Sequence, residues 1–364
     1  MATDLARAYR ACARIARRRA RNFYFAFLSL PRPQRRAVYA LYAFCCEADG
    51  VMDDSVPPSS ITKENGQAIL PVRSADARPT VPPSSIMPSS ITKKNAQAIL
   101  PVRSANARPT VPPSSITPSS ITPSSTTNES EGPGDVAARR ARIEAMRERL
   151  DASARGAPRT ERDHALAHAI ARFGVSADDL RDVLAGIEMD LAPTPIATYD
   201  ELRTYCYHVA SAVGLATLPI LTDGAPPTPA MRDAAIDLGL GMQFVNILRD
   251  VDEDLGLGRI YLPTDPLAAH GIDADALRSR RMSDPLRAVL ASHADRARAL
   301  LDSGRHLLPM LPRRSRACPW LLSEIYGRIL RRIAEADYAV FDGRVSLPAL
   351  EKGWLLLSAR WRRW

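Results

Sequence analysis

Apolar residues recur at three- and four-residue spacing through most of the chain, which is the pattern of helices that bury one face. Ile143, Met146 and Leu150 form one such stripe. Long alternations of Val, Ile and Thr joined by hairpin turns are absent. Clusters of proline and glycine, such as Pro31–Pro33 and Gly224–Pro227, supply helix ends. The pattern therefore predicts an all-α fold.

The stretch from Ser55 to Gly134 breaks this pattern. It contains 14 of the 30 prolines and no Phe, Tyr, Trp or His, so it has little with which to build a core. Ser59–Ile86 recurs almost unchanged at Ser89–Ile116, and a repeat domain is the alternative interpretation. Prolines interrupt each short apolar patch, however, and we expect a disordered, dispensable insertion at 55–134. Residues 1–54 and 135–364 then form one helical domain.

Composition narrows the function only a little. The 49 Lys and Arg against 40 Asp and Glu give a net charge of +9, which favours phosphates, anionic lipid or nucleic acid. No nucleic-acid-binding motif accompanies the charge, so we expect no nucleic acid partner. The five cysteines are scattered, which is typical of a reducing, cytoplasmic setting rather than of a disulfide framework. Apolar runs such as Ala37–Cys46 are too short to cross a bilayer.

Two pairs of acidic residues stand four positions apart, Asp49 with Asp53 and Asp250 with Asp254. On a helix each pair points from one face, where the like charges repel unless a cation lies between them. For a single pair, a solvated helix face is the simpler interpretation. Both pairs follow strongly apolar turns, however, and Asn246 precedes the second pair by one turn. Oxygen ligands on two facing helices suit Mg²⁺ that is shared with a diphosphate.

A diphosphate also requires cationic partners. The candidates are Arg249, Arg259, Arg328, Arg344 and Lys352.

Several motifs in this order and spacing resemble those of the squalene/phytoene synthase family. They are Asn22-Phe-Tyr24, Leu30-Pro31, Ala40-Leu-Tyr42-Ala-Phe-Cys45 with Asp49 and Asp53, Tyr205–Gly214, Gln243–Asp254 and Gly258–Pro263. Outside the insertion the resemblance covers nearly the whole chain. It implies the isoprenoid synthase fold, in which one helical domain encloses a central cavity. It also implies a transferase that joins two prenyl diphosphates head to head, in hopanoid or carotenoid biosynthesis.

The resemblance also assigns residues by position. Asp49, Asp53, Asp250 and Asp254 would hold Mg²⁺, or Mn²⁺, with Asn246 beside the second pair. The positions implied at the diphosphates or the cavity mouth are Tyr42, Tyr205, Tyr326, Arg344 and Lys352, and those implied in the cavity wall are Val209, Val213, Gly214 and Gln243. Taken alone, Tyr42 and Tyr205 would be interpreted as core tyrosines, and the two valines as helix packing.

The sequence leaves the substrate open. Members of the family join either two farnesyl groups, through presqualene diphosphate to squalene, or two geranylgeranyl groups to phytoene. NADPH is expected only if squalene is the final product, and no Gly-x-Gly-x-x-Gly motif follows a predicted strand. The tryptophans and arginines from Trp354 to Trp364 predict peripheral contact with the inner face of a membrane, with packing on the domain as an equal alternative. We expect a monomer.

Three features depart from the family pattern. Gly50 replaces the second Asp of the usual Asp-Asp-x-x-Asp motif, and Cys46 stands where an arginine is usual. The insertion begins at Ser55, directly after this motif. The alternative hypothesis is therefore a catalytically impaired homologue that binds or regulates an active synthase.

Overall fold

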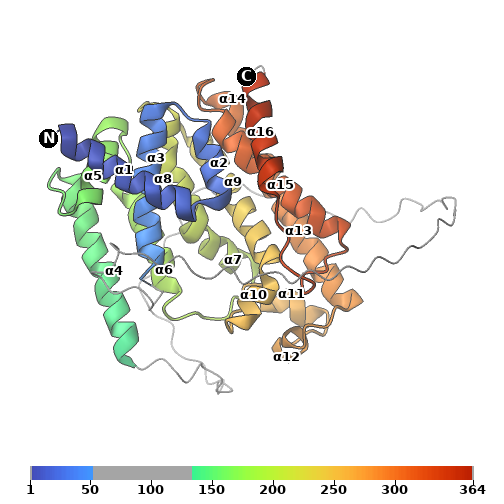
Figure 1. Ribbon diagram of the computed structural model, residues 1–364. Coiled ribbons are helices and arrows are strands. Elements are labelled where there is room, and N and C mark those ends of the chain that lie inside the picture. Colours follow the sequence, from blue (N-terminus) through green and yellow to red (C-terminus); the bar gives the residue numbers. More distant parts are fainter. Residues whose placement is uncertain (1, 52–132, 363–364) are drawn as a thin grey trace, which may run out of the picture. The chain divides into compact units, whose positions relative to one another are not determined.

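The computed structural model describes residues 2–51 and 133–362. The contacts divide the chain into two units, Met1–Asp54 with Ser114–Trp364, and Ser55–Pro113. Every described residue belongs to the first unit, which consists of helices and connecting loops without strands in its described part (Figure 1). The predicted all-α fold is thus confirmed. The predicted disorder of 55–134 falls on residues that lie almost entirely outside the described ranges.

The elements follow one another along the chain as a series of helices. They are α1 (Ala2–Arg19), α2 (Arg21–Leu28), α3 (Arg32–Asp49), α4 (Pro133–Ala154), α5 (Glu161–Phe173), α6 (Ala177–Met189), α7 (Tyr199–Cys206), the π-helix η1 (Tyr207–Ser211), α8 (Ala212–Leu221), α9 (Pro229–Arg249), α10 (Val251–Gly256), α11 (Thr264–Ala269), α12 (Ala274–Arg278), α13 (Asp284–Gly304), α14 (Leu307–Met310), α15 (Ala317–Glu335) and α16 (Ala349–Trp361).

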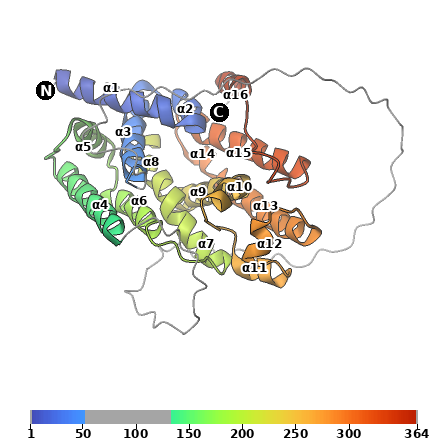
Figure 2. The same ribbon diagram turned by 60° about the horizontal axis from the view of Figure 1, so that its bottom comes forward.

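Helix α9 lies in the middle of this unit, where it packs against α13, α8, α15 and η1 (Figure 2). Glycines allow the closest approaches. A Cβ atom at Gly304 of α13 would lie 2.6 Å from the Cα atom of Leu238, and one at Gly239 would lie 2.7 Å from the Cα atom of Ser211. Since no real side chain tolerates such distances, these glycines fix how closely α13 and η1 pack on α9.

The segments α7, η1 and α8 form one helical run, Tyr199–Leu221. This run is long and apolar enough to cross a membrane, but 67% of its 18-residue apolar stretch is buried inside the protein. We therefore interpret it as a core helix. The π-turn in its middle packs against α6, where a Cβ atom at Gly186 would lie 3.1 Å from a methyl carbon of Val209.

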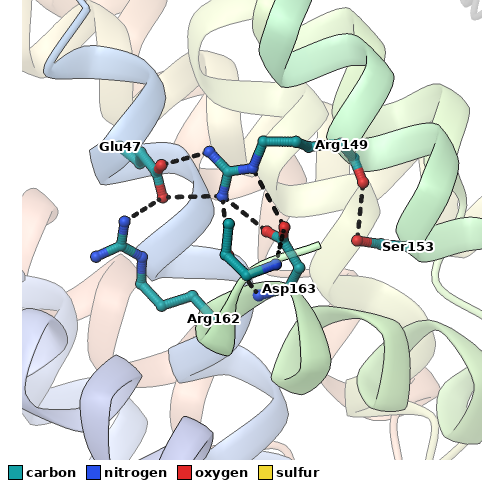
Figure 3. A network of polar contacts seen from close by, with 6 residues as sticks. Glu47, Arg149, Ser153, Arg162 and Asp163 are labelled. Carbon is teal, nitrogen blue, oxygen red and sulfur yellow. Dashed lines mark hydrogen bonds and ion pairs between the residues drawn. The ribbon is translucent and has the colours of Figure 1, made fainter. Parts of the chain in front are cut away.

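Ionic contacts hold the end of α3 to the helices that follow residues 52–132 (Figure 3). Arg149 of α4 donates to Glu47 of α3 at 2.5 Å and to Asp163 of α5 at 2.7 Å. Arg162 of α5 reaches the other oxygen of Glu47 at 3.1 Å. Asp163 also completes the cap of α5 with Thr160. This network fixes α3 two residues before Asp49.

Both acidic motifs lie where helices end. Helix α3 stops at Asp49, and Gly50 caps it. The sequence predicted Asp250 and Asp254 on one helix, but α9 ends at Arg249 and α10 begins at Val251. Asp250 takes non-helical backbone angles at the junction, where two arginines hold its carboxylate. The turn itself survives, because the Asp254 amide still donates to the Asp250 carbonyl at 2.8 Å.

Candidate active site

A pocket of about 320 Å³ lies among α3, α6, the α7–η1 run, α9 and α10. Acidic, basic and hydroxyl groups make up one part of its lining, and aliphatic side chains make up the other. The polar lining residues are Asp49, Asp190, Tyr205, Gln243, Asn246, Arg249, Asp250, Asp254, Arg259 and Tyr261, and the aliphatic ones are Val183, Ile187, Val209 and Ile247. Such a lining fits a ligand with an anionic head and an apolar tail.

Helix geometry explains how α6 and α9 supply so many of these residues. Val183, Ile187 and Asp190 follow one another at four- and three-residue spacing, so α6 and its C-cap present them on one side. Gln243 and Asn246 of α9 are one turn apart in the same way, and Asp250 comes one turn later.

Burial raises the pKa values of three carboxylates in the pocket, and in two of them a neighbouring carboxylate adds to the rise. Burial and the charge of Asp250 raise the pKa of Asp254 to about 7. Asp49 is open to the pocket, yet the surrounding protein raises its pKa to about 6, with Arg19 opposing and Asp190 adding to the shift. The pKa of Asp190 is also raised, mainly by burial. The pocket thus gathers four carboxylates, and three of them take up a proton more readily than a free carboxylate does.

Asp250 is the exception, because it is bound by two arginines. Arg249 donates from Nε to Oδ1 at 2.8 Å, and Arg344 donates from Nε to the same oxygen at 2.6 Å. Burial alone would raise the pKa of Asp250, but these hydrogen bonds lower it below its usual value. Both guanidinium groups are therefore already held at the rim of the pocket.

Two stacked tyrosines cover Asp190. The rings of Tyr205 and Tyr261 lie 5.2 Å apart and nearly parallel. The Tyr205 hydroxyl donates to Oδ1 of Asp190 at 3.1 Å, and the Tyr261 hydroxyl lies 3.5 Å from the same oxygen. Burial and the neighbouring carboxylate raise the pKa of Tyr205, so the phenol stays protonated. Flat aromatic faces of this kind stabilise nearby positive charge.

The oxygen atoms around the pocket suit the binding of a hard divalent cation. Nδ2 of Asn246 donates to Gln243 at 3.1 Å, whereas Oδ1 of Asn246 is buried without a hydrogen bond of normal geometry. This oxygen and the carboxylates are all oxygen ligands, as Mg²⁺ prefers. In residues 2–51 and 133–362, no three acidic, His or Cys side chains converge closely enough to hold a metal by themselves. Mg²⁺ commonly completes its shell with substrate phosphates and water instead.

The structure brings together seven of the residues assigned from sequence. They are Asp49, Tyr205, Val209, Gln243, Asn246, Asp250 and Asp254, which all line the pocket together with the expected cations Arg249 and Arg259. Arg344 joins them through its contact with Asp250. Asp53 lies outside the described residues.

Five assigned residues do not line this pocket, although one of them, Tyr326, lies beside Asn246: Tyr42, Val213, Gly214, Tyr326 and Lys352. Tyr42 and Tyr326 both pack against Phe23 in an aromatic cluster. A Cβ atom at Gly214 would meet the Ala235 carbonyl at 3.5 Å, so this position packs on α9. Lys352 donates to Asn22 at 2.9 Å. Arg328, another candidate cation, pairs with Glu351 instead.

Sequence reasoning missed Asp190, Tyr261 and the aliphatic residues of α6. The spacing of Val183, Ile187 and Asp190 was a usable signal, because an acid continues an apolar stripe there. Tyr261 lies in a loop after α10, so no helical spacing pointed to it, although it stands in the Gly258–Pro263 motif.

Arg19 was also missed, and it bears on the unusual Cys46. Cys46 is buried, and its carbonyl accepts a hydrogen bond from Nη1 of Arg19 at 3.2 Å. Arg19 is close enough to Asp49 to oppose the rise in its pKa. Arg19, at the end of α1, thus places a guanidinium group beside Asp49, although the position of Cys46, where an arginine is usual, provides no such group.

Comparison with known proteins gives the family. A sequence profile of the squalene/phytoene synthase family matches residues 16–73 and 127–351. The chain belongs to this family. The profile leaves out residues 74–126, which lie within the predicted insertion.

Relatives of known name are similar over long stretches. The chain is 35% identical over 209 residues to phytoene synthase 1, chloroplastic, of Arabidopsis thaliana, covering 56% of this chain and 49% of that one. It is 26% identical to the 15-cis-phytoene synthase of Synechococcus elongatus, covering 96% of this chain and 91% of that one. It thus spans about half the length of the first plant relatives that it matches, such as the Arabidopsis protein at 49%.

Solved structures show the same fold. A dehydrosqualene synthase in complex with ligand superposes with a TM-score of 0.69 at 23% identity, covering 98% of this chain and 97% of that one. A squalene synthase from Alicyclobacillus acidocaldarius superposes with a TM-score of 0.66 at 23% identity, covering 92% and 96%. The fold expected for squalene/phytoene synthases is therefore confirmed.

Proposed function

We propose that this chain is a transferase that joins two prenyl diphosphates head to head with loss of diphosphate. The observation that carries the proposal is the pocket between Asp49 and the Asp250–Asp254 turn, which combines a charged part with an aliphatic part. Membership of the squalene/phytoene synthase family supports it. The comparisons do not favour the alternative of an impaired partner protein, because the relatives are synthases by name.

The pocket residues suit ionisation of an allylic diphosphate. Arg249 and Arg344 are held at Asp250, from which their guanidinium groups can turn to the oxygens of an arriving diphosphate. Neutralising the leaving group in this way lowers the barrier to breaking the carbon–oxygen bond. The aliphatic wall around Val209 and Ile247 then keeps water away from the cationic carbon. The stacked ring of Tyr205 offers it a stabilising face.

We propose that Asp49, Asp254 and Asn246 hold Mg²⁺, or Mn²⁺, with Asp250 and Asp53 as further ligands. The raised pKa values of Asp49 and Asp254 and the buried oxygen of Asn246 support this set. The ion would supply positive charge to the diphosphate oxygens. For three residues outside the pocket lining, the proposed contact with the diphosphates is supported only by the family resemblance. They are Tyr42, Tyr326 and Lys352.

The test is release of diphosphate from farnesyl or geranylgeranyl diphosphate by the purified chain, with Asp254→Asn and Asp252→Asn compared. Asp254 lines the pocket, whereas Asp252 pairs with the exposed Arg280. Asp254→Asn should lower kcat about 100-fold or more, and Asp252→Asn should leave it nearly unchanged. If the unaltered chain releases diphosphate from neither substrate above the background rate, the proposed transferase activity is refuted. Equal activity of the two variants would refute the site.

The substrate is part of the same proposal. We propose geranylgeranyl diphosphate and phytoene ahead of farnesyl diphosphate and squalene, supported by the names of the phytoene synthase relatives. Mass spectrometry of the product from each substrate decides between them. NADPH enters the proposal only with squalene as the final product, and its test is whether adding NADPH changes that product.

We further propose that the protein works as a cytoplasmic monomer in peripheral contact with a membrane. All five cysteines are buried free thiols, which supports a reducing compartment. The exposed face of α16 supports the membrane contact.

A further inference from the structure

Helix α16 presents a row of large apolar side chains to solvent. Leu350, Trp354, Leu357 and Trp361 are 88%, 64%, 47% and 82% exposed. Their spacing of four, three and four residues places them on one face of the helix. They are four of the seven exposed large hydrophobic residues that the described part of the chain contains. The row is therefore a concentrated patch rather than the scattered exposure that is normal for soluble proteins.

The opposite face of α16 is firmly attached to the helical unit. Leu355 and Ala359 are buried, and α16 packs against α15 and α2 (Figures 1 and 2). Glu351 accepts from Arg328 at 2.8 Å and from Arg332 at 2.6 Å, both on α15. These contacts fix the rotation of α16 about its axis, so the apolar row is held outward.

Charge and side-chain type identify what covers the row. Its two tryptophans have the apolar body and polar N–H that favour the headgroup region of a bilayer. Arg360 is exposed beside Trp361, and in the sequence Arg362 and Arg363 follow, so the end of the helix is basic. Arg362 also lies over the ring of Trp320 at 4.6 Å, which ties this end to α15. A surface that is both apolar and basic matches anionic lipid.

We infer that α16 is a membrane-docking helix, which lies in the headgroup layer of an anionic bilayer with Leu350, Trp354, Leu357 and Trp361 inserted. The helix is about 20 Å long at 1.5 Å per residue, so it lies along the surface rather than crossing it. The inference rests on the proposed membrane contact and deepens it, but it is independent of the proposed chemistry, since it uses no residue of the pocket.

The experiment is co-sedimentation of the full chain, without substrate, with vesicles of phosphatidylcholine or of an equal mixture of phosphatidylcholine and phosphatidylglycerol. The chain should pellet with the mixed vesicles, and less so at high salt because screening weakens the attraction of the arginines. Trp354→Ser and Trp361→Ser should each lower the apparent affinity about tenfold. Arg360→Gln should reduce the preference for the anionic vesicles.

The matched control is Met310→Ser, which removes an exposed apolar side chain that is not on α16. It should pellet like the unaltered chain. Circular dichroism checks that each variant stays folded, which is expected because the changed side chains face solvent. Failure of the full chain to pellet, or equal pelleting of the α16 variants, would overturn the inference. A second result would also overturn it: sedimentation velocity shows a dimer that the α16 variants convert to monomer, while the chain does not bind vesicles. A second copy of the chain would then cover the row.

Discussion

His293 shows how one buried side chain makes stability depend on pH. It lies fully buried in α13, stacked on Phe244 of α9, and Nε2 donates to the Phe244 carbonyl at 3.0 Å. Nδ1 is buried without a hydrogen-bond partner. Burial lowers the pKa of His293 from an ordinary 6.5 to about 4. The folded protein therefore holds this ring neutral.

Because the pKa of His293 is lower in the folded protein than in the unfolded chain, the neutral ring contributes to stability. This contribution is fully present above pH 6.5 and is lost as the pH falls towards 4. The difference corresponds to about 3 kcal/mol in the free energy of unfolding. Replacing His293 by Gln retains a donor for the Phe244 carbonyl and removes the titration. The measurement is urea unfolding of both proteins between pH 7 and pH 4. The unaltered protein should lose about 3 kcal/mol more than the variant, and parallel curves would contradict the assignment.

Single residues also mark the limit of sequence reasoning about the site. Asp250, Asp254 and Asn246 were predictable, because residues four positions apart stay close together even across the junction of α9 and α10. Arg19 was not predictable from spacing, because its position beside Cys46 depends on how α1 crosses α3. Spacing within one stretch of chain predicts only local neighbours, whereas the counter-charge at Asp49 comes from a tertiary contact.

At the scale of elements, the contacts in Figure 3 hold α3, α4 and α5 together, and Arg149 of α4 binds a carboxylate on each of the other two helices. The side chain of Arg149 is 18% exposed, and its partner Asp163 is 4% exposed. Replacing Arg149 by Met leaves a buried carboxylate without its main counter-charge. We expect the free energy of unfolding to fall by about 3–5 kcal/mol, measured by urea denaturation at neutral pH.

Arg159 provides the comparison for this prediction. It pairs with Glu148 at 3.1 Å, but both side chains are more than half exposed. Arg159→Met should therefore cost less than about 1 kcal/mol. If the two methionine variants are equally stable, the network does not hold α3 in place. A loss confined to Arg149→Met would show that the helix carrying Asp49 depends on partners that lie beyond residues 52–132.

The elements themselves were partly predictable. Hydrophobic spacing and the proline and glycine clusters foretold helices and several of their ends, because these are local preferences. The junction at Asp250 and the π-turn at Tyr207–Ser211 were not foreseen. Both depend on tertiary partners: two arginines at Asp250, and the close-packed Gly186 and Gly239 at the π-turn. Local sequence offers no sign of such partners.

For the whole molecule, the sequence predicts that the repeats add nothing to the core. They contain no aromatic residue, and their prolines break every apolar patch, so ordering them would cost more entropy than burial returns. The family profile resumes at residue 127 after stopping at residue 73. Removing residues 74–126 therefore takes out only residues that the profile does not match, and it leaves the rest of 52–132 as the connection between α3 and α4.

We expect this deletion to leave the thermal midpoint unchanged or slightly raised, because a shorter connection loses less entropy on folding. Calorimetry of the full and the shortened chain measures it, and limited proteolysis should cut the full chain first within 74–126. The Glu47–Arg149 contact provides an internal reference: Arg149→Met should destabilise both chains equally if the deletion leaves α3 and α4 in place. A midpoint that falls by many degrees would show that the repeats pack on the helices. Diphosphate release that rises on deletion would show that these residues hinder turnover.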